Sequence, residues 1–182
     1  KMGIPVIGGA WVADNLYTEH PLYYGNSGNV GPRTGNFILQ NADVILIMGN
    51  SLGFRQTGFN LEGFAPEARI VMVDADVEEG RKPGLRIEKF VHADAGEFIG
   101  KLLEEECGVQ VPEEWLAYCD RLKERFTPYE GAKDIAPKER VNSYYFWKVF
   151  AQYEEKDSIL ALGNNTANTA KLQIGVQYAG QR

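Results

Sequence analysis

The amino-acid sequence predicts an α/β fold: a Rossmann-like parallel sheet flanked by helices, followed by a partial second α/β unit. Short runs of apolar residues recur through the first half of the chain, and segments with helical spacing separate them. Continuous apolar strands that alternate with helices are typical of a parallel sheet covered on both faces. With 182 residues and a hydrophobic content of 44%, the chain can bury a core.

The strands are predicted from four apolar runs, each ending in glycine, polar or acidic residues. IPVIGG is typical of a buried strand that leads into a tight turn. ADVILIMGN and ARIVMVDAD repeat the pattern, and EKFVHAD is a weaker fourth case. The predicted strands therefore lie within residues 4–9, 42–50, 68–76 and 88–94.

Helices are predicted between and after these runs. One spans residues 32–41, because Pro32 is favoured at the first position of a helix. Residues 77–83 are expected to form at most a short turn. A further helix begins near residue 95 and ends before Gly108, which is predicted as its C-cap.

The chain changes character after residue 110. PEEWLAYCDRLKERF is predicted as an amphipathic helix with one apolar face. That face consists of Trp115, Leu116, Cys119 and Leu122. Residues 127–140 contain prolines and a glycine and are predicted to be a linker.

The last part of the sequence begins a second α/β unit. We expect a helix from Asn142 or Ser143, a strand at SILALG, and a helix through Thr169 and Leu172. The predicted organisation is a central nucleotide-binding-like domain (1–110), a helix with a linker (111–141), and the truncated start of another domain (142–182).

Charge and cysteine content exclude several classes of function. A formal net charge of -6 without a basic run argues against nucleic-acid or membrane-surface binding. The two cysteines, Cys107 and Cys119, provide neither a disulfide framework nor a metal pair, which suits a cytoplasmic protein. No apolar run approaches the roughly 20 residues of a membrane span, and no signal peptide is recognisable. Because both ends look cut, we expect a piece of a longer protein.

The residues that follow the predicted strands are the candidates for ligand binding, because ligands of open parallel sheets sit at the carboxyl ends of the strands. Glycines there allow close approach of the backbone, and a carboxylate such as Asp74 can accept hydrogen bonds from a ribose. The fingerprint G-x-G-x-x-G is absent, however, and the stretch GNSGNVG has a different glycine spacing. Two interpretations stay open: an adenine-nucleotide site, or tight turns between strands and helices.

The order of several segments resembles a known family. GIPVIGG, HPLYYGNSGNVGPRTGNFILQNADVILIMGNSLGFRQTGF, FAPEARIVMVDADVEE and FVHADAGEFIGKLL are together similar to the central domain of thiamine diphosphate-dependent enzymes of the acetolactate synthase group. ILALGNNTANTAKLQIGVQYAGQR resembles the start of the pyrophosphate-binding domain of that family. The resemblance places Leu162, Gly163, Asn164 and Asn165 near the diphosphate.

In the synthases of that family the central domain holds FAD, and the resemblance implies a corresponding set of residues here. The set is Gly9, Ala10, Asn26, Ser27, Gly28, Asn29, Val30, Gly49, Asn50, Ser51, Arg55, Asp74, Ala75, Asp94 and Ala95. The match is incomplete, because Asn26, Asn29 and Val30 stand where flavin-binding members carry methionines and a histidine. Ser51 and Gly53 likewise replace an arginine and an aspartate, so flavin binding is expected to be weakened by about 1–3 kcal/mol per lost buried partner.

The resemblance implies a thiamine diphosphate-dependent carboligase or decarboxylase that acts on a small 2-oxo acid. Thiamine diphosphate and Mg²⁺ would serve the whole enzyme, and a cofactor site shared between subunits implies a homo-oligomer. No catalytic residue or metal ligand is assigned to this chain, because those of the family lie in other domains, so the isolated chain is expected to be inactive. The alternatives are a stand-alone FAD or NAD module and a structural spacer that binds no nucleotide.

Overall fold

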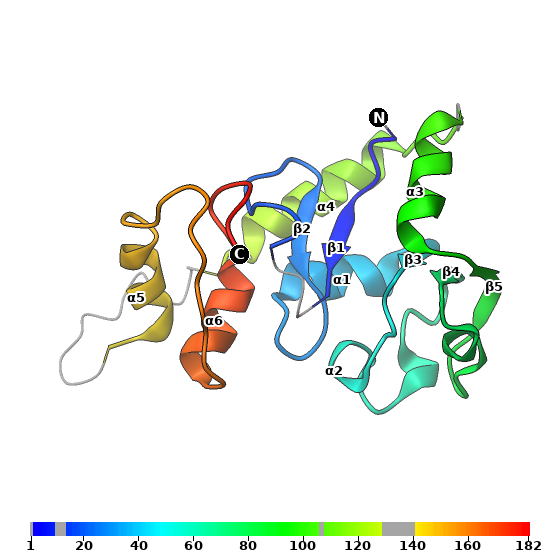
Figure 1. The fold of residues 1–182 in the computed structure, drawn as a ribbon, viewed down its shortest axis with the longest axis horizontal. Coiled ribbons are helices and arrows are strands. Elements are labelled where there is room, and N and C mark those ends of the chain that lie inside the picture. The colour runs from blue at the N-terminus through cyan, green and yellow to red at the C-terminus, as the bar shows by residue number, and fades with distance from the viewer. Residues whose placement is uncertain (1, 10–13, 106–107, 129–140) are drawn as a thin grey trace.

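The computed structural model describes residues 2–9, 14–105, 108–128 and 141–182 (Figure 1). The strands are β1 (Val6–Gly8), β2 (Tyr23–Asn26), β3 (Val44–Met48), β4 (Arg69–Asp74) and β5 (Ile87–His92). The α-helices are α1 (Arg33–Asn41), α2 (Phe54–Thr57), α3 (Ala95–Glu104), α4 (Glu113–Arg125), α5 (Ser143–Phe150) and α6 (Thr166–Ile174). Two short 3-10 helices, η1 (Leu61–Gly63) and η2 (Val77–Arg81), flank β4.

The strands form two parallel sheets, β1–β2 and β3–β4–β5. Figure 1 shows β1 and β2 in the middle of the molecule, the larger sheet on one side, and α5 with α6 on the other. The predicted α/β architecture with parallel strands and flanking helices is confirmed, and the four predicted strands correspond to β1, β3, β4 and β5.

The strand β2 is absent from the sequence prediction. Its sequence, YYGN, is short and includes glycine and asparagine, which are depleted in strands. Burial holds it in place nevertheless, because Tyr23 and Tyr24 are 3% and 2% exposed. The glycine-rich stretch, for which a nucleotide site and a tight turn are both open from the sequence, therefore starts within a buried strand.

The larger sheet carries the main hydrophobic core on one face. Ile45 and Ile47 of β3 pack there with Ile70 and Met72 of β4 and with Phe64. The expectation that both faces are covered holds for β4, whose Met72 and Val73 are each 0% exposed. It fails for β3, because Val44, Leu46 and Met48 are all more than a third exposed. The physical reason is that β3 is an edge strand of this sheet, whereas β4 lies between β3 and β5 and contacts α3.

Helix α4 packs against β2 and α1. Its Cys119 is buried against Tyr24 of β2 and Ile38 of α1, and Trp115 and Leu122 pack around them. These contacts agree with the predicted apolar face of the helix. Polar contacts reinforce the same interface: the Tyr24 hydroxyl donates to Asp120 at 2.8 Å, and the Lys123 ammonium donates to the carbonyls of Thr18, His20 and Tyr23.

Helices α5 and α6 form a separate small core around Trp147, Ala170 and Ile174. Lys171 of α6 is 6% exposed and forms an ion pair with the buried carboxylate of Glu154. Both helices agree with the sequence prediction, including the start of α5 after its N-cap Asn142.

The strand predicted at residues 158–163 is wrong. This segment forms no strand, and its backbone hydrogen bonds among the described residues join it to Arg182 and, at Ser158, to Glu155. Leu160 N–H donates to the Arg182 carbonyl at 2.6 Å, and Arg182 N–H donates to the Ser158 carbonyl at 3.1 Å. An apolar run becomes a strand only beside another strand, and no neighbouring strand lies here within the described ranges.

Two predicted helix boundaries also differ. Pro32 is the N-cap of α1 rather than its first helical residue. Helix α3 ends at Glu104 with Glu105 as its C-cap, so the prediction of Gly108 is wrong. Consecutive glutamates oppose the negative end of the helix dipole, which explains the earlier end. The linker at residues 129–140 and Cys107 lie outside the described residues.

Candidate functional site

The glycine-rich loop, residues 25–31, begins at the end of β2, and most of its N–H groups are bonded within the fold. Ser27 N–H donates to the Gly8 carbonyl at 2.9 Å, and Asn29 N–H donates to the Arg55 carbonyl at 2.8 Å. Gly31 N–H donates to the Gly28 carbonyl at 3.1 Å. A phosphate cradle needs several free N–H groups that point at the ligand. The loop does not fit a phosphate in this conformation.

Gly28 allows two segments of backbone to touch. Its φ is +96°, and an added Cβ would lie 2.1 Å from the carbonyl oxygen of Arg55 in α2. Asn36 of α1 holds the same glycine from the other side: its Oδ1 accepts from Gly28 N–H at 2.7 Å and its Nδ2 donates to the Gly28 carbonyl at 2.9 Å. Gln56 Nε2 also donates to the Ser27 hydroxyl at 3.3 Å. The loop is thus clamped between α1 and α2.

The side chain of Asn26 points into the protein. It is 1% exposed, its Oδ1 accepts from the Tyr23 hydroxyl at 2.6 Å, and its Nδ2 donates to the Leu172 carbonyl at 3.0 Å. Asn29 is exposed and Val30 is half-buried. Of the other residues predicted near β1, Gly9 is buried, and Ala10 lies outside the described residues.

The larger sheet brings most of the remaining predicted residues together at the carboxyl ends of its strands. Gly49 follows β3 next to Ala95, whose Cβ would lie 3.3 Å from a Cβ added to the glycine. Asp74 ends β4, and its Oδ1 accepts from Asp76 N–H at 2.9 Å. Asp94 Oδ1 accepts from Glu97 N–H at 3.0 Å as the N-cap of α3. Each carboxylate therefore has one oxygen engaged in a local turn or cap.

The residues that follow β3 also form hydrogen bonds within the protein. Asn50 Oδ1 accepts from Leu52 N–H at 2.9 Å, and the Ser51 carbonyl accepts from the Lys82 ammonium. The Ala75 carbonyl lies 2.9 Å from His92 Nε2. Arg55 is half-buried and its carbonyl holds Asn29. The predicted nucleotide residues near β3 and β4 thus carry turn and cap contacts.

The polar segment, residues 162–165, is exposed to solvent, in contrast to the hydrogen-bonded glycine-rich loop. All four residues are exposed, and Asn165 is the N-cap of α6, with its Oδ1 accepting from Asn168 N–H at 3.0 Å. Within the described part of the chain, the N–H groups of Gly163 and Asn164 make no hydrogen bond. Free N–H groups before a helix N-terminus suit an anion.

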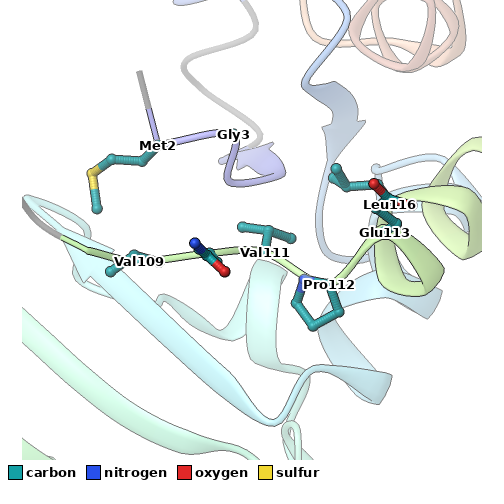
Figure 2. A pocket seen from close by; sticks show the side chains of 8 residues that line it. Met2, Gly3, Val109, Val111, Pro112, Glu113 and Leu116 are labelled. Carbon is teal, nitrogen blue, oxygen red and sulfur yellow. The ribbon is translucent and has the colours of Figure 1, made fainter.

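Two cavities among the described residues lie away from the glycine-rich loop. The larger, about 530 Å³, lies at the amino end of β1 and is lined by Met2, Gly3, residues 109–113 and Leu116 (Figure 2). It is on the wrong side for a site at the carboxyl ends of the strands. A second cavity of about 290 Å³ includes Leu162, Asn168, Lys171 and Arg182. This one lies beside the polar segment.

The titratable groups with shifted pKa values do not form a catalytic centre. Burial, followed by the charge of Asp14, raises the pKa of Tyr23 to about 12. Burial, followed by the hydrogen bond to Asp120, raises the pKa of Tyr24. Burial also raises the pKa of the Cys119 thiol to about 11, which keeps it protonated and unreactive. The described residues contain no group of three or more His, Cys, Asp or Glu able to hold a metal.

Sequence reasoning missed three residues that organise this part of the molecule. Asn36 fixes Gly28, Thr18 bonds to the end of α6, and Lys123 donates to two carbonyls before β2 and to that of Tyr23 at its start. Asn36 is half-buried in α1 and lies away from the face formed by Thr34, Gly35 and Ile38, so the helical pattern does not mark it. Thr18 and Lys123 likewise carry no signal in the sequence. Within the described ranges, no helix is long and apolar enough to cross a membrane.

Comparisons with known proteins identify the family to which the first part of the chain is similar. Residues 1–102 match the family model described as the central domain of thiamine pyrophosphate enzymes. The chain is 42% identical over 64 residues to the acetolactate synthase isozyme 1 large subunit of Escherichia coli (strain K12), covering 35% of this chain and 11% of that protein.

Two further relatives come from other organisms. A probable acetolactate synthase large subunit of Methanocaldococcus jannaschii is 30% identical over 112 residues, covering 60% of this chain and 19% of that protein. Sulfoacetaldehyde acetyltransferase of Castellaniella defragrans is 35% identical over 78 residues, covering 42% of this chain and 13% of that protein. The matches span at most 19% of the length of these three relatives.

Proposed function

Because the chain belongs to the thiamine pyrophosphate enzymes, we propose that it is part of a thiamine diphosphate-dependent carboligase or decarboxylase acting on a 2-oxo acid. The match of residues 1–102 to the central domain carries this proposal. The names of the relatives favour acetolactate synthase-like chemistry, since two are acetolactate synthase large subunits. We further propose that the complete enzyme is a cytoplasmic homo-oligomer.

The polar segment is the part of this chain that fits the cofactor. Bound thiamine diphosphate supplies the carbanion chemistry at the 2-oxo carbon. Gly163 and Asn164 would donate their free N–H groups to the diphosphate, and the positive end of the α6 dipole would favour its charge. We assign Mg²⁺ to residues elsewhere in the enzyme, since the described residues hold no cluster of acidic ligands.

We propose that the central domain does not bind FAD through the glycine-rich loop. The N–H groups of Ser27, Gly28 and Asn29 are engaged within the fold, and the Asn26 side chain is buried. The role of the domain is then architectural: it orients the domains that carry the chemistry.

Activity assays test the proposed reaction. The full-length protein is expected to release CO₂ from pyruvate and to form acetolactate only when thiamine diphosphate and Mg²⁺ are present. Sulfoacetaldehyde is the second substrate to test, because a relative is named for it. The 182 residues alone are expected to be inactive, and acetolactate formation by them would contradict this part of the proposal.

Titration with FAD, NAD and ADP tests the role of the central domain. Tryptophan fluorescence and flavin absorbance are expected to show no saturable binding. Saturable binding of FAD that is lost when Asp74 is replaced by asparagine would instead place a flavin at the carboxyl ends of β3 to β5.

A further inference from the structure

The carboxyl end of α6 is capped by residues that lie more than 140 positions earlier in the chain. The Thr18 hydroxyl donates to the Ile174 carbonyl at 2.8 Å, and Thr18 N–H donates to the Val176 carbonyl at 2.9 Å. Asn26 Nδ2 donates to the Leu172 carbonyl at 3.0 Å. The last carbonyls of a helix lack partners within the helix, so these donors satisfy groups that would otherwise be orphaned.

The capping residues have little freedom to move. An added Cβ on Gly175, whose φ is +76°, would lie 2.5 Å from the Thr18 hydroxyl. Asn26 is fixed from its other side by the Tyr23 hydroxyl. Its carbonyl oxygen would lie 2.4 Å from a Cβ on Gly31 or on Gly35, so α1 and the glycine-rich loop press on its backbone. A shift of the loop would therefore move the cap of α6.

Helix α6 connects this cap to the polar segment. The helix has nine residues, and its N-cap Asn165 is the last residue of that segment. Trp147 Nε1 of α5 donates to the Ala167 carbonyl at 2.7 Å, and Lys171 pairs with Glu154, which follows α5, so α5 and the residues after it support the helix. A helix of this length moves as a rigid element, because its backbone hydrogen bonds are internal.

We propose that Thr18 and Asn26 are positioning residues, which hold α6 and thereby fix where the polar segment meets the diphosphate. The functional part of this inference rests on the proposed function, since it requires thiamine diphosphate at residues 162–165. The consequence is that the glycine-rich loop, although closed to phosphate, contributes to cofactor affinity through Asn26. The loop contributes to cofactor affinity by holding α6 in place and not by contacting the cofactor.

Three variants of the full-length protein test the inference. Thr18→Val removes the hydroxyl with little change of shape, and Thr18→Ser keeps it. Thr34→Val is the matched control, because the Thr34 hydroxyl donates to the Leu122 carbonyl at 3.3 Å and joins α1 to α4 instead. Hydrogen exchange of the α6 amides reports how stably the helix is held whether or not the cofactor binds. Calorimetric titration with thiamine diphosphate and Mg²⁺ reports affinity.

We expect Thr18→Val to speed exchange of the α6 amides about 5-fold, the equivalent of one net hydrogen bond, and to raise the Kd for thiamine diphosphate about as much. Thr18→Ser should restore both values, and Thr34→Val should change neither. Unchanged α6 exchange in Thr18→Val would overturn the inference. So would faster exchange with an unchanged Kd, because the helix would then not set the segment. Failure of the wild type to bind thiamine diphosphate would refute the proposed function and the cofactor part of the inference, while exchange would still decide whether Thr18 holds α6.

Discussion

The glycine-rich loop and the polar segment look alike as sequences and differ in structure. Both join small and amide residues before a helix. The loop has its N–H groups bonded, its Asn26 buried at 1% exposed, and its Gly28 pressed against α2. The polar segment is exposed, and the atom nearest to a Cβ added to Gly163 is Asn165 Nδ2, at 3.7 Å. Glycine serves contact between backbones in the first case and leaves N–H groups accessible in the second, so glycine content alone does not identify an anion site.

The largest effect is expected from Gly28→Ala, which attacks the closed loop directly. The added methyl would collide with the Arg55 backbone and force a positive φ on alanine. We expect the free energy of unfolding to fall by more than about 4 kcal/mol, measured by urea denaturation. Gly53→Ala is the control, because Gly53 has no atom within 4 Å of an added Cβ. Equal stability of the two variants would mean that the loop is not clamped.

The second largest effect is expected from loss of the ion pair between Lys171 and Glu154, which supports α6 and the polar segment before it. Lys171→Met leaves the Glu154 carboxylate buried without its cation. The free energy of unfolding is expected to fall by about 3 kcal/mol, measured by thermal and urea denaturation. The double variant Lys171→Met/Glu154→Gln should recover most of the loss, because no buried charge remains. A double variant as unstable as the single one would show that packing, not charge, is responsible.

Asn36→Ala removes both hydrogen bonds to Gly28 while leaving the glycine in place. We expect a loss of about 2 kcal/mol in the free energy of unfolding, from two bonds of about 1 kcal/mol each. Asn41→Ala in the same helix is the control, since its side chain bonds only to the Phe37 carbonyl at the surface. Its stability is expected to stay within about 0.5 kcal/mol of wild type.

Alkaline pH should weaken the closed loop through Tyr23. Its pKa is 10.0 in the unfolded chain and about 12 in the folded one. Folding then favours the protonated phenol, so this stabilisation is complete below pH 10 and is lost as the pH rises towards 12. The slope is about 1.4 kcal/mol per pH unit in that window. Tyr23→Phe should reduce the slope of the free energy of unfolding by about this amount, leaving the contributions of Tyr24 and Cys119, whose pKa values burial also raises. An unchanged slope would exclude Tyr23 as a source.

The smallest change in stability is expected when the side chain of a helix N-cap is removed. A comparison of two such caps distinguishes the polar segment from the larger sheet by their effect on cofactor binding. Asn165→Ala and Asp94→Ala each remove one N-cap bond, at α6 and α3. Each should cost about 1 kcal/mol of the free energy of unfolding. Only Asn165→Ala should also raise the Kd for thiamine diphosphate, measured by calorimetry in the full-length protein. A matching rise with Asp94→Ala would contradict the assignment of the cofactor to the polar segment.

The sequence predicted the strands of the larger sheet and most helices, because their apolar periodicity is local. It failed at β2, whose glycine and asparagine are poor strand residues, and at residues 158–163, where an apolar run lacks a neighbouring strand. The hydrogen-bond partners of the candidate residues could not be predicted from the sequence. Asn26 and Thr18 bond to residues 146 and 156 positions away. Nothing in a local pattern distinguishes a glycine that faces a ligand from one that faces Arg55.

The three carbonyls held by Lys123 have a consequence for the order in which the chain folds. Their residues precede the lysine by 105, 103 and 100 positions. Contacts of such sequence separation form late, because a long loop must close first. During synthesis the segment before β2 therefore emerges well ahead of the helix that completes it. We expect nascent chains that end before α4 to be recognised by chaperones and proteases, and chains that include it to resist both.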